Sequence, residues 1–269
     1  MGVESASFEF LHDTLVLCNL FPETGGSYYR SNYYCAGAKT GSKSWVKLPP
    51  KYEFLTTKRE STVVDNSLVI IGNAIQQFKI NKESVFTGDL AINTPTGDVG
   101  GCTVYDEQSS RVLHINNGKV NEIDPSFKAP HKVINTKYIN RWMTGCAIIM
   151  NNGIRSLVVA GGYPSSADQE WLEFGSTVEV LELDDLKGGK NIAPRIIPAS
   201  KLMHNNQPAV TQVGSDILVI GGGEVSKEER RCAEKWTGRE WTVMDLDCDD
   251  LGIRGSPLVT FVPSSFCEY

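Results

Sequence analysis

A short apolar run that recurs along the chain is the feature that most constrains the fold of this sequence. Four-residue runs of aliphatic and β-branched residues begin at positions 15, 68, 112, 157 and 217, so successive runs start 53, 44, 45 and 60 residues apart. A spacing of roughly 50 residues indicates a repeat architecture, in which each unit buries its apolar surface against its neighbours. We therefore expect five similar structural units.

Each unit has the pattern of four antiparallel strands. In four units another apolar segment precedes the core run across a short polar turn, which is typical of a β-hairpin; these segments are 61–64, 102–105, 146–149 and 208–211. Alternating segments follow at 75–80, 119–123 and 177–183, and a fourth segment is clearest at 45–49 and 241–244. Period-two alternation predicts strands, and no helical periodicity exceeds about two turns. Four strands in about 50 residues predict the blade of an all-β propeller.

Glycine and tryptophan positions resemble those of the kelch-repeat propellers. Gly161-Gly162 follows the core run at 157–160, and Gly221 opens a glycine run after 217–220, as in the Gly-Gly pair of a kelch blade. Trp45 and Trp241 fit the tryptophan of the fourth kelch strand. The resemblance implies a kelch-like propeller fold, but a fold does not imply a function.

We predict a single domain over 1–269, a five-bladed propeller, with a six-bladed closure as the alternative. The segment 256–263 resembles the first strand of the fifth unit and is predicted to close the ring by completing the first blade. The segment 8–10 competes for the same place. The predicted blades are 12–50, 58–94, 98–136, 142–200 and 204–247.

Composition excludes several classes of protein and partner. Apolar residues make up 41% and charged residues 22%, which excludes a disordered chain. The net charge of −6 offers no cationic field for nucleic acid or for an anionic membrane surface. The longest apolar runs have about six residues, whereas a membrane span needs roughly 20. We therefore expect neither nucleic acid nor a membrane as a partner.

The cysteines predict reduced thiols and a cytoplasmic location, with secretion after processing as the alternative. There are seven, an odd number, without CxxC spacing, and the chain has no Asn-x-Ser/Thr sequon. Cys102 and Cys146 hold matching places in adjacent inner strands, where they could line the channel together. Cys232 and Cys248 are the expected pair in an oxidising compartment.

The predicted ligand site lies where loops from several blades converge over the channel. In this strand order, loops that enter each inner strand share one face with the loops between the second and third strands. Arginine side chains bind carboxylate or phosphate, and a tryptophan face covers a sugar, so we predict a small anionic or sugar-like ligand. In the alternative interpretation, such residues brace blade junctions by bonding to loop carbonyls. The predicted ligand-binding residues are Arg59, Asp98, Arg141, Trp142, Tyr163, Trp171, His204, Asn206 and Arg254.

The predicted function is a binding module for such a ligand or for a protein partner. The alternative is a metal-free enzyme of isomerase, lyase or cyclase type, with Asp98 or His204 as the base and the arginines stabilising an enolate or oxyanion. The four histidines show no HxH or HExxH spacing, and no nucleotide or dinucleotide fingerprint occurs. We therefore expect neither a metal nor a cofactor.

Overall fold

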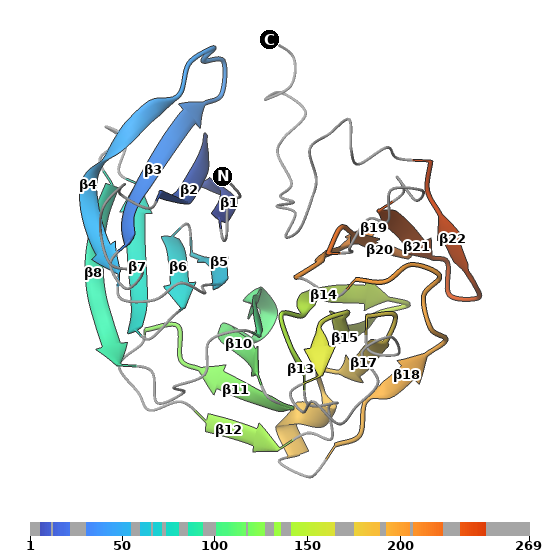
Figure 1. Cartoon of the computed structure of the whole chain (residues 1–269). Helices are drawn as coiled ribbons and strands as arrows, with labels where there is room; N and C mark the ends of the chain where they lie inside the picture. The colour runs from blue at the N-terminus through green and yellow to red at the C-terminus, as the bar shows by residue number, and fades with distance from the viewer. Residues whose placement is uncertain are drawn as a thin grey trace. The chain divides into compact units, whose positions relative to one another are not determined.

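The computed structural model contains five four-stranded antiparallel sheets and one two-stranded sheet within the residues that it describes (Figure 1). In each of these sheets the strands follow one another in chain order. The only helices in the described ranges are two short 3-10 turns, Glu107–Ser109 and Asp185–Gly188, and none of the helices there has the length and apolarity needed to cross a bilayer. The described residues are 6–11, 13–21, 31–54, 60–65, 67–71, 74–80, 86–93, 101–116, 118–126, 132–135, 141–164, 175–188, 192–204, 207–222 and 232–245. An all-β chain built from four-stranded units is thereby confirmed.

The described strands fall into two compact units, and the first contains two of the sheets. Its inner strands β1 and β5 contact each other, and Leu11, Val16, Leu68 and Val69 are buried. The first sheet consists of β1 (Ala6–Leu11), β2 (Thr14–Phe21), β3 (Ser31–Lys39) and β4 (Val46–Phe54). The second consists of β5 (Glu60–Val64), β6 (Ser67–Ile71), β7 (Ala74–Ile80) and β8 (Phe86–Asn93).

The inner strand of the first sheet is not the one that we predicted. β1 pairs antiparallel with β2, with Phe10 opposite Leu15, so this sheet begins at residue 6 rather than 12. The place that we assigned to the C-terminal segment 256–263 is therefore taken by the competing N-terminal segment. A two-residue connection closes a β1–β2 hairpin at far lower entropic cost than pairing with a segment more than 200 residues away. The segment 256–263 lies outside the described residues.

The second unit contains the other three sheets, whose inner strands β9, β14 and β19 are neighbours in that order. Two short strands, β13 (Arg141–Trp142) and β16 (Tyr163–Pro164), pair with each other. In the chain, β13 precedes the fourth sheet and β16 follows the second strand of that sheet. The third sheet consists of β9 (Cys102–Asp106), β10 (Arg111–Asn116), β11 (Lys119–Ile123) and β12 (Lys132–Asn135). The fourth consists of β14 (Gly145–Asn151), β15 (Ile154–Ala160), β17 (Val178–Glu182) and β18 (Arg195–Ile197). The fifth consists of β19 (Ala209–Val213), β20 (Asp216–Ile220), β21 (Ala233–Trp236) and β22 (Trp241–Val243).

The recurring apolar runs are the second strands of the sheets, and β15 shows why they do not alternate with polar residues. Leu157 and Val159 enter the core cluster shared with the third sheet. Val158 and Ala160 enter the cluster shared with the fifth sheet. A strand covered on both faces needs apolar side chains at successive positions, so it forms a continuous run.

The two tryptophans assigned to fourth strands differ in their surroundings. Trp241 begins β22, is 3% exposed and donates its indole N–H to the carbonyl of Pro198 at 2.7 Å. Its ring lies 5.5 Å from that of Trp236. Trp45 lies one residue before β4 and is 49% exposed. Of these two tryptophans, therefore, Trp241 lies in the core and Trp45 does not.

Candidate functional site

The glycine pair of the fourth sheet creates room for the chain entering the fifth. Gly161 and Gly162 have φ of +66° and +94°, and the N–H of Gly162 donates to the carbonyl of His204 at 2.9 Å. A Cβ on Gly161 would lie 2.0 Å from that carbonyl oxygen. Glycine therefore suits these positions for two reasons. It adopts a positive φ without strain, and it leaves room for the His204 carbonyl where a Cβ would clash. Gly221 and Gly222 follow β20 with φ of +70° and +75°.

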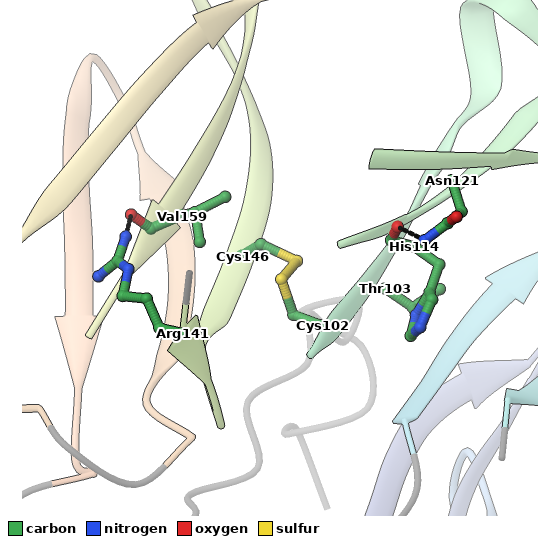
Figure 2. The surroundings of a disulfide bond; sticks show 7 residues. All are labelled: Cys102, Thr103, His114, Asn121, Arg141, Cys146 and Val159. Atoms are coloured by element: carbon green, nitrogen blue, oxygen red, sulfur yellow. Dashed lines mark hydrogen bonds between the residues drawn. A yellow bond between two sulfur atoms is a disulfide. The ribbon is translucent and has the colours of Figure 1, made fainter. Parts of the chain in front are cut away.

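Arg141, which precedes the inner strand of the fourth sheet, points into the protein. Its side chain is 1% exposed, and its Nη2 lies 2.5 Å from Oε2 of Glu179 on β17. Nη1 donates to the carbonyls of Gly161 at 2.5 Å and Thr177 at 3.0 Å. Nη2 also donates to the Val159 carbonyl at 3.4 Å, the contact that Figure 2 shows. The guanidinium braces the end of β15.

His204, which precedes the inner strand of the fifth sheet, is held in the same manner. Its Nδ1 lies 2.5 Å from the carbonyl oxygen of Gly221, and its Nε2 lies 2.9 Å from Oε1 of Glu234 on β21. The ring is thereby held between a backbone carbonyl and a side-chain carboxyl group. Glu234 also accepts the backbone N–H groups of Lys201 at 3.0 Å and Leu202 at 3.4 Å. This carboxyl group therefore contacts Lys201, Leu202 and His204 in the connection between the fourth and fifth sheets.

The same arrangement of contacts therefore occurs in the fourth and in the fifth sheet. In each case a basic side chain bonds to the first glycine carbonyl of the pair and to a buried carboxylate on the third strand. Glu179 lies opposite Val159, and Glu234 lies opposite Val219. The third sheet has Asn121 opposite His114, and its Nδ2 donates to the His114 carbonyl at 3.2 Å (Figure 2). Sequence reasoning missed these acceptors, because a polar residue in an alternating third strand is expected to face solvent.

The predicted ligand residues divide into three groups. For Arg141 and His204 the structure favours the bracing alternative, because both side chains are at most 2% exposed and bonded to protein groups. Trp142 and Tyr163 pair with each other on two short strands. The remaining five predicted residues, Arg59, Asp98, Trp171, Asn206 and Arg254, lie outside the described residues, so their convergence on a ligand stays a prediction.

Trp142 and Tyr163 form an aromatic pair at the same end of the fourth sheet. They lie opposite each other in the β13–β16 pairing, with ring centroids 6.5 Å apart and planes at 59°. Trp142 is 36% exposed, whereas Arg141 before it is 2% exposed. Successive side chains of a strand point to opposite faces, so the buried guanidinium anchors the strand that presents the indole outward.

The inner strands of the third and fourth sheets are joined by a disulfide between Cys102 and Cys146 (Figure 2). Cys232 is disulfide-bonded as well, while Cys248 lies outside the described residues. The prediction of reduced thiols is thus wrong at these cysteines. The Cα atoms of Cys102 and Cys146 are 5.8 Å apart despite a sequence separation of 44, and this distance is typical of disulfides. Side-by-side packing of inner strands creates this proximity, which cysteine spacing does not encode.

No group of three His, Cys, Asp or Glu side chains within the described ranges is arranged to hold a metal ion.

Comparison with known proteins identifies the fold. No family model matches the sequence, and no curated protein matches it. The structure of YjhT is 12% identical in sequence, with a TM-score of 0.62 over 89% of this chain and 83% of YjhT. A structural genomics protein of unknown function from Bacteroides thetaiotaomicron is 8% identical, with a TM-score of 0.51 over 88% of this chain. This chain spans 58% of that protein's length. These likenesses show a propeller fold.

Proposed function

We propose that this protein is a propeller-based binding module that holds a sugar-like ligand at the loop end of its sheets. The observation that carries the proposal is the exposed indole of Trp142 beside Tyr163, on a strand anchored by the buried Arg141. A rigid aromatic face covers the apolar face of a sugar ring and loses little conformational entropy on binding.

The contacts that Arg141 and His204 make within the protein bear on which class of ligand we propose. Their charged or polar groups bond to protein acceptors, so they are not offered to a ligand in this structure. The described residues at the glycine-pair end of the sheets therefore favour aromatic stacking on a ligand over ion pairing with it. Arg59 and Arg254 remain the proposed contacts for a carboxylate on an acidic sugar.

The proton-transfer alternative gains no support from His204. A general base must reach the substrate proton, but both ring nitrogens of His204 face Gly221 and Glu234. We therefore place binding ahead of catalysis, with Asp98 as the remaining proposed base in the enzymatic alternative.

A glycan microarray of neutral and acidic saccharides, probed with the native chain, tests this function. The variant W142A should bind the recognised glycan at least about tenfold more weakly, which corresponds to about 1.4 kcal/mol of stacking. W45A is the matched control because it removes another exposed indole from the first unit, and it should bind as the native chain does.

Three results would contradict the proposal. Equal binding by W142A and the native chain would exclude stacking on Trp142. Recovery of a protein partner by pull-down, without saccharide binding, would favour the protein-binding alternative. Turnover of a bound saccharide would favour the enzyme.

A further inference from the structure

A cavity of about 420 Å³ lies between the fourth and fifth sheets, at the end opposite the glycine pairs. The β14–β15 turn and the first residue of β18 line one side, and the β19–β20 and β21–β22 turns line the other. All four lie at the same sheet end, because antiparallel strands bring their hairpin turns together. The volume is within the range typical of small-molecule sites. Sequence reasoning looked only at the other end of the sheets.

The cavity has an apolar floor. Ile149, Val180, Ile217 and Trp236 line it, and all four belong to the core cluster between the two sheets. The floor is therefore held by the packing of both sheets and is formed before a ligand arrives. An indole wall beside aliphatic side chains suits a flat apolar body.

The rim of the cavity is polar and carries two cations. Arg195 begins β18 and Arg239 lies in the β21–β22 turn, and both side chains are exposed. Hydroxyl and amide groups complete the lining; they belong to Asn151, Asn152, Ser156, Ser215 and Thr237.

These two arginines differ from the other arginines of the described part. Arg111 and Arg155 both pair with Asp106, and Arg141 pairs with Glu179. Neither Arg195 nor Arg239 has a carboxylate partner among the described residues. Two guanidinium groups around one cavity thus retain their capacity for bidentate bonds to an anion.

We propose that this cavity binds a small organic anion with a flat apolar body. Its carboxylate or sulfonate lies between Arg195 and Arg239, and its body packs on Trp236 and Ile217. The proposal is independent of the sugar site, because Trp142 lies at the glycine-pair end of the fourth sheet, where its carbonyl approaches Gly162.

A fluorescence titration of the native chain with 1-anilinonaphthalene-8-sulfonate tests the proposal. This probe combines an apolar aromatic body with a sulfonate, and we expect one saturable site. The double variant R195A/R239A should weaken binding at least tenfold. Both side chains are exposed, so the fold should survive, and circular dichroism checks this.

Two controls separate the cavity from general effects of charge. K119A/K132A removes two exposed cations of the third sheet and should bind the probe as the native chain does. The uncharged analogue N-phenyl-1-naphthylamine should bind R195A/R239A within about twofold of the native chain, since the apolar floor is intact.

The proposal is overturned if the native chain shows no saturable binding of the sulfonate. It also fails if R195A/R239A binds that probe as tightly as the native chain, or if K119A/K132A loses as much affinity. Equal weakening of both probes by R195A/R239A would show a collapsed cavity instead of a lost anion contact and would likewise overturn it.

Discussion

Arg141 and His204 are different amino acids that hold equivalent positions in consecutive sheets. Each bonds to the first glycine carbonyl of its sheet and to a buried carboxylate, Glu179 or Glu234. The glycine carbonyls need such donors because the left-handed turns remove them from the regular ladder, and buried acceptors are costly when unpaired. The residue type is therefore variable, whereas the donor role is repeated.

Alanine substitution at two glycines separates backbone strain from steric exclusion. Gly153 has φ of +80° with nothing within 4 Å of an added Cβ, so G153A should lower the free energy of unfolding by about 1–2 kcal/mol. In G161A the Cβ would also lie 2.0 Å from the His204 carbonyl oxygen, and the loss should exceed about 3 kcal/mol. Urea unfolding measures both variants. Equal losses would contradict the assigned close approach.

At the scale of elements, the third and fourth sheets are joined by a buried charge network at their hairpin end. Asp106, at the end of β9, is 2% exposed. It accepts the Ser109 hydroxyl, Nε of Arg111 at 3.1 Å and Nη1 of Arg155 on β15. Burial raises the pKa of this carboxyl, but the hydrogen bonds from Ser109 and Arg111 and the charge of Arg155 outweigh it, so the net pKa lies below 3.8.

The lowered pKa predicts acid sensitivity at this junction. A carboxyl whose folded pKa is lower than its unfolded pKa stabilises the fold above the unfolded value of about 3.9, and this contribution is lost as pH falls through the folded value. The native chain should therefore be more stable than D106N at pH 7, and the difference should shrink below about pH 5. Unfolding free energies measured between pH 7 and pH 3 test this. A difference that stays constant with pH would contradict the role of Asp106.

The disulfide between Cys102 and Cys146 joins the inner strands of the same two sheets. Closing a loop of this length lowers the entropy of the unfolded chain, with a stabilisation of about 2–4 kcal/mol. Dithiothreitol should therefore lower the thermal midpoint of the native chain. C102S/C146S should have the lower midpoint without reductant and should change less when reductant is added. Identical responses of the two proteins would show that this bond contributes nothing to stability.

At the scale of the whole molecule, a propeller that forms one domain over 1–269 should unfold as a unit. We expect a single transition in urea with coincident curves from far-UV circular dichroism and tryptophan fluorescence, and a spectrum dominated by β-structure. Tryptophans such as Trp45 in the first unit and Trp236 in the second report on both parts. Two separated transitions would favour independent domains and contradict the single-domain prediction.

The sequence alone predicted the second strand of every sheet and most of the neighbouring strands. A strand such as β15, covered on both faces, must be apolar at successive positions, and this local pattern needs no tertiary information. The Gly161-Gly162 pair was equally visible, since glycine is the residue that adopts positive φ without strain.

Only the tertiary structure decided which way the polar residues at the sheet junctions point. Nothing local distinguishes Arg141, turned inward to Glu179, from Arg195, left at the rim of a cavity, because the difference lies in what residues far along the chain place beside each guanidinium. The disulfide was missed for the same reason. The β1–β2 hairpin, by contrast, is a local pairing that the sequence offered as the alternative to the C-terminal segment. Strand patterns are set by local burial, whereas partners are set by distances that exist only after the sheets have packed.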